Sequence, residues 1–273
     1  MSHALARKVR TVATSRGPTD LPHLILNETT NRMPHIGIIA CTAEGTALCY
    51  QTLCREAEDL MGLHTHPEIS MHTFSLRSYL DAIDRDDWVS VAALMSRSAA
   101  KLAQAGADIV ICPNNTLHRA FDLAISPVPR LHIAEAVAAE AARRRFHRVG
   151  ILGTQVVMEG PVYPLKLRKF NIDSVIPQVR DRTRIQDIIR TELLEGNFTT
   201  KSRLFLRKVI TKLRADGAEA VILGCTELPL LLSEEQSTVP LLDSTRLLAR
   251  AALTYALVQE QVPSTPRDFS HSR

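Results

Sequence analysis

Short apolar runs recur along the chain, separated by longer segments whose apolar positions have helical spacing. The runs at 36–40 and 149–153 are rich in isoleucine and valine and end in small residues, and the runs at 108–112 and 220–224 are similar. Central strands of a parallel sheet have this composition because helices cover both of their faces. We therefore predict a buried strand at each of these four places.

Two of the longer segments have clear helix signals. Residues 88–106 follow two aspartates and end at Gly106, while residues 201–217 end at Gly217. Acidic residues before a helix and glycine after it are common start and stop signals. Alternating strands and helices predict an α/β fold built on parallel sheets flanked by helices.

The chain contains an internal repeat. Three pairs of segments are similar, in the same order and at nearly the same offset: 35–41 with 148–154, 105–116 with 216–227, and 128–138 with 239–249. Repeats of this kind indicate duplicated structural units. We expect two pseudo-symmetric domains with the active site in the cleft between them.

The domain boundaries follow from these patterns. We predict a first domain at 33–132, completed by a C-terminal helix at about 245–258, and a second domain at 133–244, followed by a tail at 259–273. Residues 1–32 differ, because four basic residues precede the first acid. A transit peptide has this balance, but we favour a disordered or irregular extension.

Composition narrows the classes of function. Hydrophobic residues make up 45% of the chain, charged residues 23% and aromatic residues 4%, with a formal net charge of +4. Few aromatics and scattered charges disfavour a nucleic-acid partner, and no apolar run is long enough for a membrane span. The odd count of five cysteines and the lack of C-x-x-C spacing argue against a disulfide framework. We therefore expect a reducing, cytoplasmic location.

Candidate site residues lie where the predicted strands end, since ligands of parallel sheets bind beyond the carboxyl ends of the strands. Four segments qualify: 41–44, 114–118, 154–158 and 225–227. The repeat offset of 111 residues pairs Cys225 with Asn114. We expect these two residues to approach one ligand from opposite sides.

Cys225 is the strongest candidate for chemistry. It follows an apolar strand and precedes a predicted helix, whose dipole would lower the pKa of the thiol. A cysteine at a strand end can also simply pack. The glycine before it and the polar Thr226 and Glu227 after it favour the reactive interpretation.

Substrate contacts are predicted beside it. Asn115, Thr116 and Thr226 offer amide or hydroxyl groups at helix starts, where backbone N–H groups bind carboxylates, although such residues are also ordinary helix caps. Thr154 heads the matching segment of the second half. His118 is a further candidate, although a lone histidine is more often structural.

No cofactor is indicated. His64, His66, His72 and Glu68 lie close together, but their spacing matches no usual zinc pattern, so we expect no metal. The glycine-rich nucleotide motifs and the G-x-S-x-G serine motif are absent from the sequence. Arg77, Tyr163 and Lys166 could contact a substrate side chain, but we expect ordinary surface residues.

The motifs resemble those of the aspartate/glutamate racemase superfamily over about residues 33–256. The similar stretches are "GIIACTAEGTALCYQTL", "NNTLH", "GCTELPLLL" and "VPLLDSTRLLARAALTYA". The resemblance implies a homodimer that needs no pyridoxal phosphate. It also implies two cysteines flanking the α-carbon of an amino acid, one removing a proton and the other delivering one.

The sequence departs from the family pattern at two places. Cys225 matches the second family cysteine, but Asn114 stands where the first belongs, and Val157 replaces a frequent threonine. An amide cannot carry a proton as a thiol does. Cys41, and less plausibly Cys112, could supply a second thiol, since Cys41 ends the first strand at the rim of the cleft.

Three functions follow from this combination. The first is a racemase-like isomerase for Asp, Glu or a related amino acid, with Cys225, Asn114 and Cys41 in catalytic positions. The second is a single-cysteine decarboxylase of a malonate-type dicarboxylate. The third is a pseudoenzyme that binds an amino acid or carboxylate without turnover.

Overall fold

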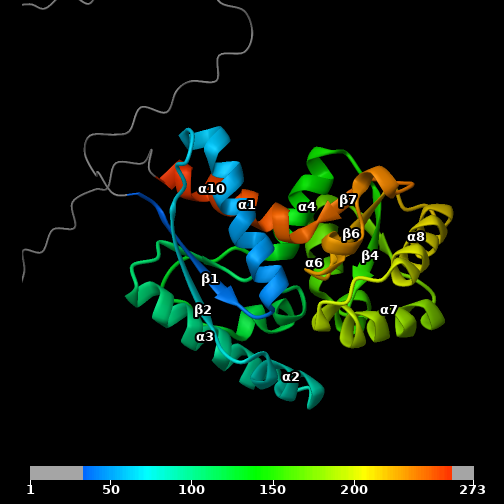
Figure 1. Cartoon of the computed structure of the whole chain (residues 1–273), viewed down its shortest axis with the longest axis horizontal. Coiled ribbons are helices and arrows are strands. Elements are labelled where there is room, and N and C mark those ends of the chain that lie inside the picture. Colours follow the sequence, from blue (N-terminus) through cyan, green and yellow to red (C-terminus); the bar gives the residue numbers. More distant parts are fainter. Residues whose placement is uncertain (1–32, 260–273) are drawn as a thin grey trace, which may run out of the picture.

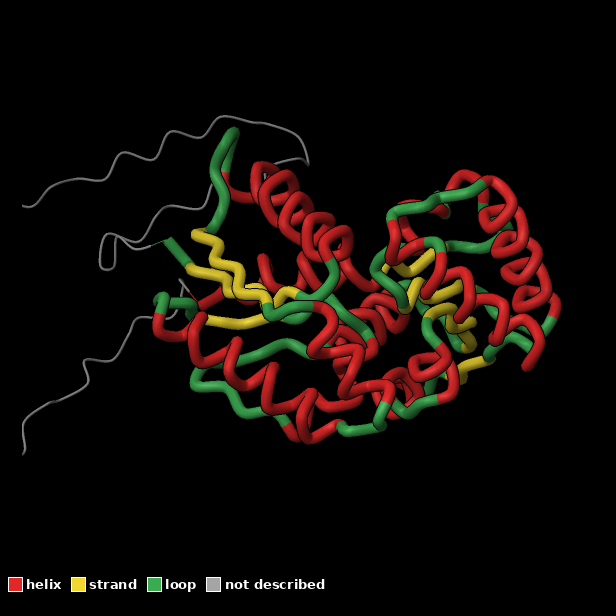
Figure 2. The backbone as a smooth tube through the Cα atoms, turned by 60° about the horizontal axis from the view of Figure 1, so that its bottom comes forward, coloured by secondary structure: helices red, strands yellow, loops and turns green. Residues whose placement is uncertain are grey.

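The computed structural model describes residues 33–259 and contains two separate parallel sheets, each with its own covering helices (Figures 1 and 2). The α/β fold with two sheet-based domains is therefore confirmed. The predicted extension at 1–32 and nearly all of the predicted tail lie outside the described residues. The exact boundary between the domains stays a prediction.

The first sheet has the strand order β2-β1-β3, with β1 at His35–Ala40, β2 at Glu68–Thr73 and β3 at Ile109–Ile111. Four helices cover it: α1 (Ala43–Met61), α2 (Leu76–Asp84), α3 (Trp88–Gln104) and α10 (Ser244–Gln259). Alternate strand residues face opposite cores. Ile36 and Ile38 pack with α1 and α10, while Ile39 packs with α3.

The second sheet has the order β5-β4-β6-β7, with β4 at Arg148–Gly153, β5 at Asp173–Val175, β6 at Ala220–Gly224 and β7 at Leu241–Asp243. Its helices are α4 (Ile133–Arg143), α5 (Gln155–Glu159), α6 (Val162–Leu167), α7 (Val179–Thr191), α8 (Thr200–Ala215) and α9 (Leu228–Leu231). Figure 1 shows α4 and α6 on one face of this sheet and α7 and α8 on the other.

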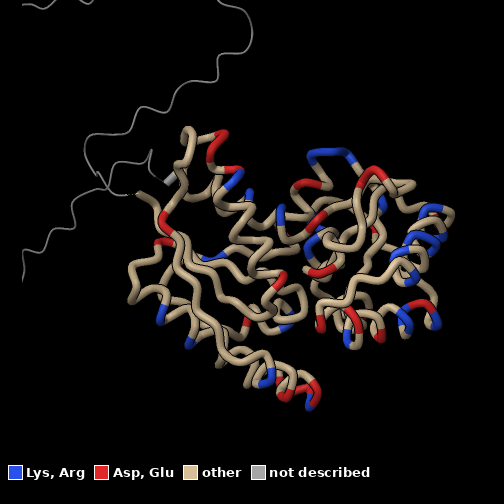
Figure 3. Tube along the Cα trace, in the orientation of Figure 1, with Lys and Arg blue, Asp and Glu red and all other residues tan. Residues whose placement is uncertain are grey.

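Short 3₁₀ helices complete the chain at η1 (Thr116–Leu123), η2 (Arg168–Phe170), η3 (Leu193–Glu195) and η4 (Glu234–Gln236). Charged residues lie mainly in the helices and turns, whereas the central strands have almost none (Figure 3). Both faces of each sheet are buried, which explains why the strands appear in the sequence as continuous apolar runs.

The predicted helix signals have the expected geometry. The side chain of Asp87 accepts a hydrogen bond from the Ser90 N–H at 3.0 Å at the start of α3, and Thr199 accepts one from Ser202 N–H at 3.1 Å at the start of α8. Gly106 and Gly217, after the two helices, have φ values of 95° and 91°. Glycine adopts this left-handed conformation without strain, so both stop signals are confirmed.

The internal repeat is visible in the backbone. The N–H of Val221 donates to the carbonyl of Pro240 at 2.9 Å, and 111 residues earlier the N–H of Val110 donates to Pro129 at the same distance. In the second half this pairing becomes β7, whereas in the first half it remains a single bridge between Val110 and Arg130. The two sheets thus share one topology.

A buried chain of hydrogen bonds joins the two halves. Tyr163 on α6 donates its hydroxyl to Asn115 Oδ1 at 2.5 Å, and Asn115 Nδ2 donates to Ser244 Oγ at 2.9 Å. The Ser244 hydroxyl then donates to the carbonyl of Leu223 on β6 at 2.7 Å. Tyr163 is fully buried, so the expectation of a surface residue was wrong.

We predict that Tyr163→Phe destabilises the protein. The substitution leaves Asn115 Oδ1 buried without its donor, which should lower the free energy of unfolding by about 1 to 3 kcal/mol. Urea unfolding followed by circular dichroism measures this change. Tyr50→Phe is the matched control, because Tyr50 is 39% exposed. A Tyr163→Phe midpoint equal to that of the control would contradict a structural role for this hydrogen bond.

Candidate active site

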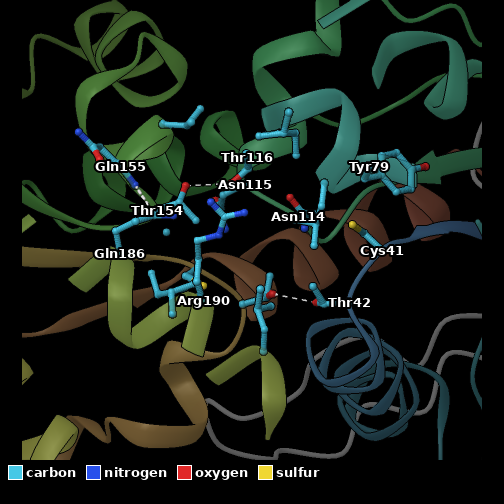
Figure 4. Close-up of a pocket in the computed structure, with 18 of the residues that line it drawn as sticks. Cys41, Thr42, Tyr79, Asn114, Asn115, Thr116, Thr154, Gln155, Gln186 and Arg190 are labelled. Carbon is cyan, nitrogen blue, oxygen red and sulfur yellow. Dashed lines mark hydrogen bonds between the residues drawn. The ribbon is translucent and has the colours of Figure 1, made fainter. Parts of the chain in front are cut away.

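A cavity of about 670 Å³ lies where the strands of both sheets end, and residues of both domains line it (Figure 4). All four predicted segments contribute: Cys41 and Thr42 after β1, Asn114, Asn115 and Thr116 after β3, Thr154, Gln155 and Val156 after β4, and Cys225, Thr226 and Glu227 after β6. The rule that ligands bind beyond the carboxyl ends of parallel strands thus locates the cavity correctly.

Cys225 shares the cavity wall with a buried carboxylate. Its Sγ donates a hydrogen bond to Glu227 Oε2 at 3.0 Å, and Glu227 is only 1% exposed. The other oxygen, Oε1, has no hydrogen-bond partner among the residues that the structure describes. A buried acceptor of this kind is available to a ligand.

The pKa of Cys225 is shifted opposite to the sequence-based expectation. Burial raises the pKa of the thiol well above its usual value, and the charge of Glu227 raises it further. The backbone N–H groups of Glu227 and Leu228 oppose this shift only in part. The expected net lowering was therefore wrong, because burial and the charge of Glu227 outweigh the N–H groups at the start of α9.

Cys41 and Asn114 occupy neighbouring places on the first-domain wall. Strands β1 and β3 pair Ile38 with Ile111, and Cys41 and Asn114 each lie three residues further along these adjacent strands. Figure 4 shows both side chains in the wall of the cavity. Burial raises the pKa of Cys41 well above its usual value, with Cys112 and Glu227 adding to the shift.

Asn114 presents a hydrogen-bond donor to the cavity. Its Oδ1 accepts a hydrogen bond from the Leu117 N–H at 3.1 Å, which fixes the orientation of the amide. The Nδ2 group is therefore the half of the amide that can donate to a ligand. An amide donor can bind a carboxylate oxygen but cannot carry a proton.

Cys112 does not belong to this cavity. It faces the core between the first sheet and α3 and is 2% exposed. Burial raises the pKa of its thiol to about 12. Cys112 is thus removed as a candidate for the second thiol, while Cys41 remains.

Two pairs of threonines bridge the domains across the cavity. The hydroxyls of Thr116 and Thr154 lie 2.9 Å apart, and those of Thr42 and Thr226 lie 3.4 Å apart. Gly45, in the first turn of α1, permits the second approach, because a Cβ there would lie 2.2 Å from Thr226 Oγ1. Three of these threonines, Thr116, Thr154 and Thr226, are predicted substrate contacts, and all four line the cavity.

Two predicted substrate contacts have mainly structural surroundings. The amide of Asn115 lines the cavity but is already bonded to Tyr163 and Ser244. His118 does not line the cavity, since its Nδ1 donates to the carbonyl of Asn114 and its Nε2 accepts from the Ile133 N–H. We therefore correct the role of His118 from substrate contact to support of the Asn114 loop.

Val157, which replaces a frequent family threonine, is fully buried. Its N–H donates to Thr154 Oγ1 at 3.4 Å, and its side chain packs close to Gly153 and Gly224. It contributes to the packing beneath the cavity floor and adds no polar group there.

Sequence reasoning missed several residues of the site. Glu227 appeared only as part of a polar turn, although its position two residues after Cys225 was the available signal. Ser244 went unnoticed and Tyr163 was expected to be a surface residue, because their roles depend on contacts between distant segments. Asp84 and Arg190, which pair across the domains at the cavity, also went unrecognised.

His64, His66, His72 and Glu68 do not come together as a set of metal ligands. Within residues 33–259, no cluster of three or more His, Cys, Asp or Glu side chains is arranged to hold a metal ion. His72 Nδ1 lies 3.0 Å from Ser98 Oγ, and His66 Nδ1 lies 2.7 Å from the carbonyl of Pro67. In the same part of the chain, every helix is too short or too polar to cross a membrane.

A family model described as Asp/Glu/Hydantoin racemase matches residues 36–252, which include every segment of the cavity. The chain belongs to this racemase family. The match confirms the resemblance drawn from the motifs around Asn114 and Cys225.

Individual relatives agree with this membership. This chain is 25% identical over 199 residues to the broad specificity amino-acid racemase RacX of Bacillus subtilis. The match covers 71% of this chain and 84% of RacX. A Yersinia pestis structure, provisionally described as an Asp/Glu racemase, has a TM-score of 0.75 and 32% identity, covering 82% of this chain and all of the other. The structure of an aspartate racemase homologue from Pyrococcus horikoshii has a TM-score of 0.71 and 28% identity. The match covers 82% of this chain and 99% of the homologue.

The first prediction for this site concerns the reactivity of Cys225. The thiolate is the nucleophile, so a raised pKa should make alkylation by iodoacetamide keep accelerating between about pH 7 and pH 10 without a plateau. Mass spectrometry of the Cys225 peptide measures the rate. Glu227→Gln removes the nearby negative charge and should move the profile to lower pH.

Glu159→Gln is the control for this experiment, because Glu159 also lines the cavity but binds Arg182 at 2.7 Å. Its profile should match that of the wild type. Superimposable profiles for the wild type and Glu227→Gln would refute the electrostatic coupling between Cys225 and Glu227.

The second prediction concerns stability in acid. Burial lowers the pKa of His118 to about 4 and that of His132 to about 2, from an ordinary value of 6.5. Below pH 6.5 the unfolded chain binds protons at these histidines while the folded protein does not. The free energy of unfolding should therefore fall as the pH is lowered from about 6.5 to about 4, and urea unfolding across this range measures it.

His118→Gln should reduce this pH dependence, in addition to any uniform loss of stability. His147→Gln is the control, because the side chain of His147 is 84% exposed. An unchanged slope of stability against pH in His118→Gln would show that His118 does not remain neutral in the folded protein.

Proposed function

We propose that this protein is a cofactor-independent, racemase-type isomerase that exchanges the α-proton of an amino acid through Cys225. The observation that carries the proposal is the hydrogen bond between Cys225 Sγ and the buried Glu227 in the wall of a cavity shared by both domains. Membership of the racemase family and the similarity to RacX support it.

Glu227 gives Cys225 a local proton acceptor. The thiol proton moves to the carboxylate, and the resulting thiolate removes the α-proton, so that the C–H bond breaks and an S–H bond forms. The electron pair left on carbon is delocalised into the substrate carboxylate. A thiol with a raised pKa yields a strongly basic thiolate, which suits the weak acidity of an α-proton.

Hydrogen-bond donors stabilise the charge that develops on the substrate carboxylate. The Nδ2 group of Asn114 and the hydroxyls of Thr116 and Thr226 line the cavity for this purpose. Donors that are already in place need no reorganisation during the reaction, which is the main advantage of such a site. The substrate ammonium donates a hydrogen bond to Glu227 Oε1, the oxygen without a partner among the described residues, which leaves Oε2 to accept the thiol proton.

Cys41 is proposed as the thiol of the opposite face. Strand pairing sets Cys41 beside Asn114 and, in the same way, Thr154 beside Cys225. In the first wall the thiol follows β1 and the amide follows β3. In the second wall the hydroxyl follows β4, the counterpart of β1, and the thiol follows β6, the counterpart of β3. This arrangement compensates for the asparagine at position 114.

Decarboxylation of a malonate-type acid is the second candidate. Asn114 favours it, because one thiol suffices to protonate a carbanion after carbon dioxide has left from the other face. Release of carbon dioxide from a panel of malonates would distinguish it. Under either reaction we propose a cytoplasmic homodimer, as the cysteine usage and the family resemblance suggest.

The deciding experiment is α-proton exchange in deuterated water, followed by NMR, over L- and D-amino acids without added cofactor. Cys225→Ala should lower exchange by about 100-fold or more, because proton transfer by a positioned group contributes at least that much. Cys41→Ala should retain exchange at one face and lose racemisation.

Cys54→Ala is the control, since Cys54 is a partly exposed cysteine outside the cavity lining. It should leave both exchange and racemisation unchanged. Exchange that persists at the wild-type rate in Cys225→Ala would exclude the proposed mechanism.

A further inference from the structure

We infer that this site prefers amino acids with a neutral, apolar side chain over aspartate and glutamate. The inference rests on the proposed function and names its substrate class. It follows from two properties of the cavity: an apolar part of the wall formed by both domains, and arginines that are already paired with carboxylates.

The apolar part of the wall comes from α2 and from the end of α7. Leu76, Leu80 and Ile83 have i, i+4, i+7 spacing, which puts them on one face of α2. Ile189 on α7 and Leu194 on η3 line the same cavity from the second domain. Asp84 and Arg190, the next residues after Ile83 and Ile189, form an ion pair across the domains, which brings the ends of α2 and α7 together at this cavity.

This wall leaves apolar surface for a ligand to cover. Leu76, Leu80, Ile83 and Leu194 are only partly buried, although all four face the cavity. An apolar side chain that covers such surface gains about 25 cal/mol for each Å² removed from water. The cavity volume of about 670 Å³ also admits side chains larger than that of aspartate.

The charged groups of the lining do not favour a side-chain carboxylate. Arg190 Nη2 lies 3.0 Å from both oxygens of Asp84. Arg119 lies 3.4 Å from Asp86 and stacks over the ring of Trp88 at 4.5 Å. Both arginines that line the cavity are thus already engaged within the described chain.

The remaining charged groups of the lining are acidic. Glu227 is buried with one oxygen that has no hydrogen-bond partner among the described residues, and Glu159 binds Arg182. A second carboxylate on the substrate would lose its hydration without gaining a new cation. The ammonium and α-carboxylate of a neutral amino acid, by contrast, find Glu227 and the donors around Asn114.

The competing possibility is that Arg190 leaves Asp84 and binds a substrate side-chain carboxylate. The side chains of both partners are about half exposed, and an ion pair of this kind contributes only about 0 to 1 kcal/mol. Arg190→Leu separates the two possibilities. If Arg190 recognises an acid, this variant loses activity and affinity for glutamate. In our inference it retains activity with methionine.

The experiment compares L-methionine with L-glutamate, which are of similar size, on the full-length protein. Calorimetry measures binding, and α-proton exchange by NMR measures turnover. We expect tighter binding and faster exchange for methionine by at least about tenfold, the discrimination that an apolar pocket readily provides. Leucine and phenylalanine should bind and exchange like methionine, and aspartate should bind and exchange like glutamate.

Ile83→Arg tests the wall itself, because an unpaired cation there should shift the glutamate-to-methionine ratio at least about tenfold toward glutamate. Leu76→Arg is a second variant in case the first fails to fold. Ile125→Arg is the matched control, since Ile125 is 77% exposed and lies outside the cavity lining. It should leave the ratio unchanged.

The outcomes are distinct. Tighter binding of glutamate than of methionine, or binding of neither, would overturn the inference. Methionine binding without Cys225-dependent exchange would support this preference and refute the proposed function instead. A ratio that shifts equally in Ile83→Arg, Leu76→Arg and the control would show that α2 does not set the preference.

Discussion

The buried hydrogen bonds of the Asn115 amide hold the cavity in its shape. The amide accepts from Tyr163 of the second domain and donates to Ser244, which itself binds the backbone of β6 beside Cys225. A buried amide without such partners is costly, so these hydrogen bonds stabilise the observed relative position of the two halves. That position brings the two thiols and the threonine pairs to one cavity.

The two walls of the cavity have the same backbone arrangement, as the internal repeat predicts, but their side chains differ in chemistry. Asn114, Asn115 and Thr116 correspond to Cys225, Thr226 and Glu227 at the repeat offset. The first wall therefore offers donors and an internal hydrogen-bond network, whereas the second offers a thiol and a carboxylate. Cys41, at the end of the neighbouring strand β1, gives the first wall a sulfur, so a thiol lines the cavity from each domain.

Burial decides how these groups behave. The same exclusion of water that raises the pKa of Cys225 and Cys41 strengthens each hydrogen bond made to a ligand. Burial is the main cause of both raised pKa values, and the charge of Glu227 adds to each of them.

Much of this architecture follows from the sequence alone. Apolar runs, helix caps, the stop glycines at 106 and 217 and the repeat are local or periodic signals, and they predicted the strands, the helices and the cleft. The strand-end rule and the repeat then identified Cys225, Asn114 and Cys41 as neighbours of one site. Contacts between distant segments were decided only by the tertiary structure. They placed Tyr163 in the interior, turned His118 toward the backbone and paired the cavity arginines with acids. They also raised the thiol pKa values, because a pKa depends on burial and on neighbouring charges that no local pattern records.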